Sequence, residues 1–230
     1  MSNLTTELTA EVSKIFQDMW SKREGRVVPD TESLTLKNDA VTIEGTVLYA
    51  DLSASTALVD ENTPEFAAEV YKVYLRCAAR IITSEGGTVT AYDGDRVMSV
   101  FVGGLKNTSA ARAALKINYA VAKIINPRIQ MQYPKTSYRV RQVVGIDTSS
   151  LLVAKTGVRG ANDLVWVGKA ANHAAKLCAI SDSAAYITDT VYNRLQDEAK
   201  LSNGRPMWEA RTWTQMGNQR VYRSDWLWTL

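Results

Sequence analysis

Residues 46–58 read Thr-Val-Leu-Tyr-Ala-Asp-Leu-Ser-Ala-Ser-Thr-Ala-Leu, an apolar β-favouring run that ends in one carboxylate and continues into small hydroxyl residues. Side chains alternate along a strand, so Leu48 and Ala50 share a face that can bury against helices. Tyr49 and Asp51 then share the other face, at the end of the strand. Taken alone, the pattern is equally consistent with a solvated aspartate before a helix-capping turn.

A second stretch, residues 88–101, supplies the partner that the first stretch needs. It reads Thr-Val-Thr-Ala-Tyr-Asp-Gly-Asp-Arg-Val-Met-Ser-Val-Phe, two β-rich runs around Asp93-Gly94, a pair that favours tight hairpin turns. Asp95 therefore lies at the tip of a predicted hairpin. If this hairpin pairs beside the strand that ends at Asp51, two carboxylates from separate strands face one small volume.

Two carboxylates at close range repel each other unless a cation lies between them. Oxygen ligands without cysteine or histidine favour Mg²⁺ or Mn²⁺, which usually keep water and phosphate oxygens as their remaining ligands. The backbone N–H groups of residues 52–56, where a helix is expected to begin, are suited to bind those phosphates. The two stretches together predict a site for a nucleoside triphosphate.

Length and composition limit the class of protein. At 230 residues the chain could form one domain or two small ones, with the composition of a soluble globular protein. A formal net charge of +3 is too small and too dispersed to predict binding to nucleic acid or to a membrane. No long apolar run or signal peptide is visible, so we expect a cytosolic, cytoplasmic protein. Cys77 and Cys178 lie in helical apolar patterns, which favours buried reduced thiols over a disulfide or metal site.

The first residues of the chain form a separate pattern. Apolar residues recur at helical spacing over residues 4–22, which predicts an amphipathic helix. We expect its apolar face to pack on the domain that follows; the alternative is a helix that meets a partner chain. Residues 24–42 contain Gly25 and Pro29 among scattered polar residues and are typical of a connector. The predicted division is a helix and connector over residues 1–42 and one domain over residues 43–230.

The central elements alternate between strands and helices. A helix over residues 63–84 begins at Thr63-Pro64, and a second over residues 107–125 is expected to end at Asn126-Pro127. With a strand predicted over residues 138–147, the order is β-α-β-β-α-β, an α+β ferredoxin-like arrangement. The later segments are predicted as an extended excursion over 148–165, a helix from 168, a strand over 184–187, a helix over 189–198, and terminal strands packed down by Trp208, Trp213, Trp226 and Trp228.

Three motifs together resemble the class III nucleotidyl cyclases. They are Leu-Tyr-Ala-Asp-Leu-Ser-Ala-Ser-Thr at residues 48–56, Gly-Asp-Arg-Val-Met-Ser-Val-Phe at residues 94–101, and Val-Gly-Lys-Ala-Ala-Asn-His-Ala-Ala-Lys-Leu at residues 167–177. The resemblance covers roughly residues 43–195 and keeps the motifs in order. It implies a ferredoxin-like catalytic core with extra terminal strands, assembled as a head-to-tail homodimer.

The resemblance also implies a role for each matching position. Asp51 and Asp95 would hold two divalent metal ions, Mg²⁺ or Mn²⁺, and the carbonyl of Leu52 would touch one of them. Asn172 matches the asparagine that orients the ribose, and Lys176 stands where most relatives have an arginine that stabilises charge on the α-phosphate. In the family, the two carboxylates of one chain face the asparagine and basic residue of the other. The turn that would cradle the triphosphate contains Ser53, Ala54, Ser55 and Thr56.

The positions that read the base depart from the purine cyclases. Adenylate cyclases carry a lysine three residues before the hairpin glycine and an aspartate or threonine three before the glycine of the asparagine-bearing helix; guanylate cyclases use glutamate and cysteine. Here these positions are Ala91 and Val165, neither of which can hydrogen-bond a purine edge. Losing both polar partners weakens purine discrimination. Tyr49 would shorten the cleft, and Arg96 is a candidate to read a pyrimidine carbonyl, with an exposed strand-edge arginine as the alternative.

This pattern resembles the pyrimidine cyclases of bacterial antiphage defence, the Pycsar group, which make cyclic UMP or cyclic CMP for a separate effector protein. The resemblance implies UTP as substrate before CTP, with an adenylate or guanylate cyclase as the alternative. Two other classes remain open. A catalytically silent cyclase-like dimerisation module would lose the metal carboxylates, and both are present. A ferredoxin-like RNA-binding module would carry cations on its central strands, where this chain has few.

Two further positions carry expectations. Relatives often have a phosphate-gripping lysine in the terminal hairpin; Gln215-Met216-Gly217 stands there instead, and Arg159 and Arg211 are the candidates to replace it. His173 is the single histidine. We expect it on the helix surface or at an interface rather than as a base or ligand.

Overall fold

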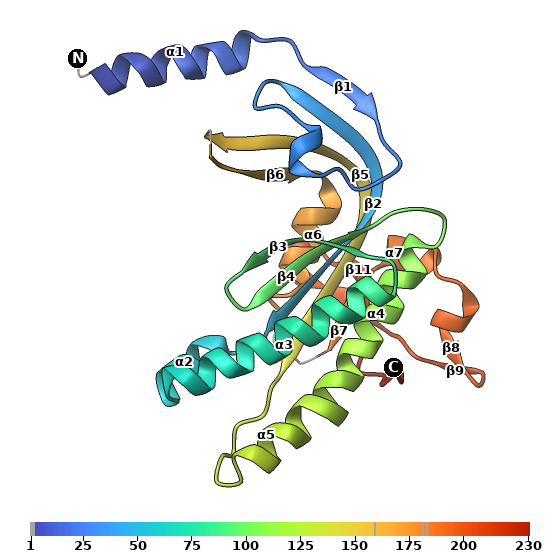
Figure 1. Ribbon diagram of the computed structural model, residues 1–230. Coiled ribbons are helices and arrows are strands. Elements are labelled where there is room, and N and C mark those ends of the chain that lie inside the picture. Colours follow the sequence, from blue (N-terminus) through green and yellow to red (C-terminus); the bar gives the residue numbers. More distant parts are fainter. Residues whose placement is uncertain (1–2, 159, 181, 183) are drawn as a thin grey trace.

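The computed structural model describes residues 3–158, 160–180, 182 and 184–230 (Figure 1). Strands occupy β1 (Ser21–Glu24), β2 (Asp39–Leu52), β3 (Thr88–Asp93), β4 (Arg96–Phe101), β5 (Gln142–Val158), β6 (Ala161–Val167), β7 (Ala185–Thr188), β8 (Leu201–Ser202), β9 (Arg205–Pro206), β10 (Glu209–Trp213) and β11 (Gln219–Ser224). Within the described residues, nine of them form one sheet, with the order β10-β11-β7-β5-β2-β4-β3 and with β1 beside β2 and β6 beside β5. The short β8 and β9 pair separately.

The helices complete the expected core. They are α1 (Asn3–Gln17), α2 (Ser55–Glu61), α3 (Pro64–Ser84), α4 (Lys106–Ala120), α5 (Asn126–Gln132), α6 (Lys169–Leu177) and α7 (Asp189–Asn193). The elements β2, α3, β3, β4, α4 and β5 follow one another as β-α-β-β-α-β, and β2 is antiparallel to both β4 and β5. The predicted α+β ferredoxin-like core is confirmed.

The two faces of β2 are buried against different helices. Leu48 and Ala50 belong to the core that α3 and α4 cover. Val47 and Tyr49 belong to a second core together with Ala171 of α6. Helix α6 therefore lies on the same face of the sheet as Tyr49 and Asp51, opposite to α3 and α4, and the alternation predicted from residues 46–58 places the site residues beneath it.

The helix predicted over residues 107–125 does not end at Asn126-Pro127. After α4 the chain forms one π-helical turn over Val121–Ile125 and continues as α5 to Gln132. The N–H of Asn126 bonds to the carbonyl of Val121, five residues back. Pro127 then lies in the first turn of α5, where a missing N–H is tolerated. The expected end was wrong because the wider turn carries the chain past the proline.

The strand predicted over residues 138–147 begins later than expected, because residues 138–141 are not in a strand and β5 begins at Gln142. Strand β5 runs to Val158 through most of the predicted excursion, and β6 returns antiparallel to it. Gly157 has a φ of 107°, and a Cβ there would meet the carbonyl oxygen of Ala161 at 2.3 Å, so this turn requires glycine. The helix predicted over residues 189–198 is also shorter: α7 ends at Asn193, and a 3-10 turn follows over Asp197–Ala199.

The N-terminal helix does not pack on the rest of the chain. No described residue of α1 is buried, and Figure 1 shows the helix extending away from the sheet. The amide of Asn38 donates to the carbonyls of Ile15 and Asp18 at 2.8 and 2.7 Å and fixes the end of the helix. Strand β1 then pairs in parallel with the start of β2, inside the predicted connector. The expected packing is wrong, and contact of α1 with a partner chain stays a prediction.

The C-terminal segment packs down as predicted. Strands β10 and β11 form an antiparallel pair that extends the sheet beyond β7. Trp208 and Trp213 are buried, and Trp226 and Trp228 pack against the main core. Cys77 and Cys178 are free and half-buried, rather than fully buried as expected. Among the described helices, none has the length and apolar character needed to cross a membrane.

Candidate active site

The two predicted carboxylates converge at one end of the sheet. Asp51 lies opposite Arg96 in the β2–β4 pair, and Asp95 lies in the two-residue turn just before Arg96. Burial, followed by the charge of Asp95, raises the pKa of Asp51 to about 6, while the nearby Arg96 opposes the rise. One carboxylate oxygen of Asp95 is buried without a hydrogen-bond partner among the described residues. Both side chains are therefore partly desolvated and held close to a like charge.

Two side chains from outside β2 hydrogen-bond to the backbone near the end of this strand. The hydroxyl of Tyr74, in α3, donates to the backbone carbonyl of Asp51 at 3.3 Å. Tyr74 is fully buried, and its own pKa is raised by that burial. The thiol of Cys178 donates to the carbonyl of Tyr49 at 3.4 Å. The carboxylate of Asp51 thus projects from a strand end whose backbone is anchored by the core.

The turn after Asp51 contains one buried side-chain hydroxyl that has no hydrogen-bond partner among the described residues. The N–H of Ser53 bonds to the carbonyl of Arg141 at 2.9 Å, but its hydroxyl is buried with no partner among the described residues. Ala54 has a φ of 59°, a left-handed conformation that a non-glycine residue rarely adopts. Ser55 and Thr56 then begin α2. The turn therefore offers a hydroxyl and strained backbone next to the carboxylate pair.

A cleft of about 470 Å³ lies between the hairpin and α6. Its lining includes all five residues predicted to contact the nucleoside: Tyr49, Ala91, Arg96, Val165 and Asn172. Within it, the guanidinium carbon of Arg96 lies 5.7 Å from the centre of the Tyr49 ring. Within one chain, the predicted base and ribose positions therefore share a cavity.

Arg96 is held by a neighbour that the sequence reasoning missed. Its guanidinium forms an ion pair with Asp93 at 2.5 Å across the mouth of the hairpin turn. That hydrogen bond is the largest of the effects that raise the pKa of Arg96. Asp93 also lines the cleft, so a charged pair borders the space where a base would lie. The position was visible in the sequence only as a turn residue.

Helix α6 approaches the sheet closely enough to touch its backbone. A Cβ at Gly145 of β5 would meet the carbonyl oxygen of Ala174 at 2.2 Å, so this contact requires glycine. Asn172 and Lys176 are exposed on the outer side of α6. The ammonium of Lys176 lies 3.7 Å from the sulfur of Met216, and Lys176 does not line the cleft. The charged groups that shift the pKa of Asp51 are Asp95, Arg96 and Asp93.

The donors fit a hard divalent cation. Asp51, the unpartnered Asp95 oxygen and nearby backbone carbonyls provide oxygen atoms alone, which suits Mg²⁺ or Mn²⁺. Among the described residues, no group of three or more histidine, cysteine, aspartate or glutamate side chains is placed to bind a metal. The chain therefore offers two carboxylates, and the remaining ligands would be water and phosphate oxygens.

His173 was expected on the helix surface or at an interface, and it does not lie on the helix surface. It is 8% exposed, and its Nδ1 lies 3.2 Å from a carboxylate oxygen of the buried Asp147. Its ring meets Trp213 edge-on at 5.6 Å. The expected place on the helix surface is wrong because the inward position of His173, next to the exposed Asn172, shows only when the helix is docked. Of the phosphate-binding candidates, Arg211 pairs with Glu209 at 2.8 Å, and Arg159 lies outside the described residues.

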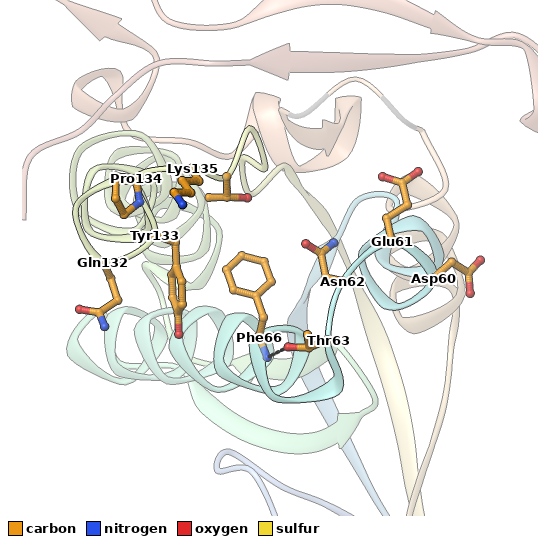
Figure 2. Close-up of a pocket in the computed structure, with 10 residues that line it drawn as sticks. Asp60, Glu61, Asn62, Thr63, Phe66, Gln132, Tyr133, Pro134 and Lys135 are labelled. Atoms are coloured by element: carbon orange, nitrogen blue, oxygen red, sulfur yellow. Dashed lines mark hydrogen bonds between the residues drawn. The ribbon is translucent and has the colours of Figure 1, made fainter.

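A larger pocket contains none of the predicted site residues. It measures about 820 Å³ and lies between the start of α3 and the loop after α5, where Phe66 and Tyr133 face the hollow (Figure 2). Their rings are 5.0 Å apart in an edge-on contact, and the Thr63 hydroxyl caps α3 by accepting from the Phe66 N–H at 3.3 Å. Because the larger pocket contains none of the predicted site residues and the smaller cleft contains five, we assign the nucleoside to the smaller cleft.

Solved structures share this fold. The guanylyl cyclase Cya2 superposes with a TM-score of 0.69 at 18% identity, covering 81% of this chain and 94% of its own. The adenylyl cyclase CyaB from P. aeruginosa gives a TM-score of 0.64 at 21% identity, covering 80% of this chain and 95% of its own. The fold is therefore that of the class III cyclase catalytic domain, as the three motifs predicted.

Curated proteins extend the match to the whole chain, although no family model matches it. A uridylate cyclase of Xanthomonas perforans is 57% identical over 228 residues, and one of Burkholderia cepacia is 49% identical over 229, each covering 99% of both chains. A third, from a Rhodovulum strain, is 34% identical over 97% of this chain and 96% of its own. The chain belongs to this uridylate cyclase family of class III nucleotidyl cyclases.

Proposed function

We propose that this nucleotidyl cyclase converts UTP to 3′,5′-cyclic UMP and pyrophosphate. The observation that carries the choice of base is the cleft, whose lining includes Tyr49 and Arg96 together with Ala91 and Val165. Alanine and valine leave a purine edge without hydrogen bonds, while the phenol ring occupies space that a larger base would need. The names of the full-length relatives support the same substrate.

The carboxylates of Asp51 and Asp95, with the carbonyl of Leu52, would hold two Mg²⁺ or Mn²⁺ ions. Bound there, these ions supply charge that lowers the pKa of the ribose 3′-hydroxyl and neutralises the triphosphate. The turn over Ser53 and Ala54, continuing through Ser55 and Thr56, binds the phosphate tail through the free Ser53 hydroxyl and backbone N–H groups.

The reaction is an in-line substitution at the α-phosphorus. The 3′-oxygen forms the new P–O bond and loses its proton to solvent, the bond to the β-phosphate oxygen breaks, and pyrophosphate leaves with the bonding electrons. Asn172 orients the ribose by hydrogen bonds. Lys176 stabilises the charge that builds on the α-phosphate, as a point charge without the planar fork of arginine.

Each active site draws on two chains. Asp51 and Asp95 lie at the strand ends, whereas Lys176 contacts Met216 of the terminal segment and does not line the cleft of its own chain. A head-to-tail homodimer would bring Asn172 and Lys176 of one protomer to the carboxylates of its partner. The arrangement explains why the carboxylate pair of one chain has no lysine among the groups that shift the pKa of Asp51.

Arg96 is proposed to read a pyrimidine carbonyl. Its ion pair with Asp93 and its place beside Tyr49 hold the guanidinium toward the cleft. Both UTP and CTP carry the 2-carbonyl, so CTP remains the second candidate, ahead of ATP or GTP. We propose that the cyclic product acts in the cytoplasm on a separate effector protein in antiphage defence, as in the Pycsar group that the motifs resemble.

The test is substrate conversion. Purified protein is incubated separately with ATP, GTP, CTP and UTP in Mn²⁺, and the products are identified by mass spectrometry. Cyclic UMP in excess over the other three products supports the proposal. Exclusive conversion of ATP or GTP would refute the pyrimidine assignment, and conversion of none by an intact dimer would favour a silent module.

A further inference from the structure

A polar cluster between α6 and the sheet joins the helix to two strands. Asp147 of β5 is 1% exposed and accepts a hydrogen bond from the Thr188 hydroxyl of β7 at 2.5 Å. The strands β5 and β7 are parallel, with Ile146 opposite Ile187. Asp147 and Thr188, the next residue in each strand, are therefore neighbours. The second carboxylate oxygen of Asp147 lies 3.2 Å from Nδ1 of His173 in α6.

Two atoms of this cluster, one from Asp147 and one from His173, lack a hydrogen-bond partner among the described residues. A buried carboxylate is unfavourable unless it is hydrogen-bonded or paired. The two atoms are the Asp147 oxygen that faces α6 and the Nδ1 of His173, and they approach each other to 3.2 Å. A rotation of α6 about its axis would separate them.

The position of His173 within α6 links this cluster to the chemistry. Successive helical residues are turned by about 100°, so a residue held on the inner side fixes where its neighbours point. Asn172 immediately precedes His173, and Lys176 follows three residues later, both exposed on the outer side. The close contact between Gly145 and Ala174 sets the distance of α6 from the sheet. The histidine sets its rotation, braced by the edge of Trp213.

We propose that the buried pair of His173 and Asp147 is a positioning device, which fixes the rotation of α6 and thereby places Asn172 and Lys176 for reaction on the nucleotide. This inference rests on the proposed function of those two residues. His173 itself touches no substrate. Burial lowers the pKa of His173, and the nearby Asp147 opposes that shift.

Two matched variants test this role. His173→Phe keeps an aromatic ring beside Trp213 but leaves the Asp147 oxygen that faces α6 without its histidine neighbour. His173→Gln keeps a polar group toward Asp147. We expect His173→Phe to lower kcat for UTP by about 10- to 100-fold, with KM changed less than about threefold, because small displacements of catalytic groups have effects of this size. His173→Gln should recover most of kcat. If His173→Phe folds poorly, the double variant Asp147→Leu with His173→Phe removes the buried charge, and it should fold yet remain slow.

Mixing variants separates positioning from general damage. His173→Phe chains keep their carboxylates, so mixed dimers with Asp51→Ala should regain activity, whereas mixtures with Lys176→Ala should not. Unchanged kcat in the folded Phe variants, or no recovery in the mixture with Asp51→Ala, would overturn the inference. Wild-type protein that converts no nucleotide would instead refute the proposed function, so the two failures are distinguishable.

Discussion

Burial and the neighbouring Asp95 carboxylate together raise the pKa of Asp51 to about 6. A carboxyl group in an unfolded chain has a pKa of about 4, so the folded state holds the Asp51 proton more tightly than the unfolded state does. Stability that is present below pH 4 is therefore lost as the pH rises through about 6. Without a bound cation, the carboxylates of Asp51 and Asp95 destabilise the folded state at neutral pH, as expected of groups arranged to bind a cation.

This relationship predicts the effect of Asp51→Asn on the metal-free protein. Without the charge, the variant should be more stable than wild type at pH 8 by about 1 kcal/mol, after allowance for the solvent that screens this half-buried group. The difference should vanish near pH 4. Urea unfolding in EDTA at both pH values measures it, with the exposed Asp60→Asn as control. Equal stability of the variant and wild type at pH 8 would show that the surroundings of Asp51 do not raise its pKa.

Addition of Mn²⁺ should reverse that order. A ligand that binds only the folded state stabilises it by RT ln(1 + L/Kd), where L is the free ligand concentration; this is about 2.7 kcal/mol when L is one hundred times the dissociation constant. Wild-type Tm should therefore rise with Mn²⁺, and the Tm of Asp51→Asn or Asp95→Asn should not. The rise should be smaller at pH 5, because protons compete for Asp51. A wild-type Tm that ignores Mn²⁺ with UTP analogue present would contradict the metal assignment.

Tyr49→Ala should relax the choice of base. The hydroxyl of Tyr49 contacts the sulfur of Met98 at 3.0 Å, and its ring narrows the cleft beside Arg96. Removing the ring opens space for a purine, so the ratio of kcat/KM for UTP over ATP should fall by about 10-fold or more. Tyr49→Phe keeps the ring and should keep the ratio within about threefold. An unchanged ratio in Tyr49→Ala would mean that the ring does not select the base.

Gly145→Ala should displace α6. The added Cβ would meet the Ala174 carbonyl oxygen at 2.2 Å and the Leu177 Cβ at 2.8 Å. Backbone contacts of this kind cannot yield without a shift, so we expect a loss of about 2 kcal/mol in the free energy of unfolding and a lower kcat. The control is Gly104→Ala, where nothing lies within 4 Å of the new atom. A Gly145→Ala protein as stable and active as this control would contradict the packing of α6 on β5.

The core and most of the site could be predicted from the sequence because their signals are local. Alternation along residues 46–52 determines which face carries Tyr49 and Asp51, and the turn at Gly94 places Asp95 beside them. Ala91 and Val165 could be predicted to line the cleft because the resemblance to the class III cyclases assigns base-reading roles to their positions. The strand face and the hairpin turn depend on short-range geometry that every strand and hairpin shares.

The features that could not be predicted depend on contacts between distant segments. His173 looks like a surface residue until α6 docks over Asp147, 26 positions earlier in the chain. The apolar stripe of α1 predicts burial, but the stripe does not specify a partner, and here the helix stands away from its own chain. The π-helical turn before Pro127 is likewise a local accommodation that proline statistics do not reveal.

The most direct test of the account is subunit mixing. Asp51→Ala and Lys176→Ala are each purified, shown to be inactive on UTP, and then combined under conditions that allow chains to exchange. In a two-fold dimer with shared sites, half of the dimers are mixed and each regains one intact site, so we predict about a quarter of wild-type cyclic UMP synthesis. If the mixture, with exchange demonstrated, stays as inactive as its components, the two halves of the site do not come from different chains and the account is wrong.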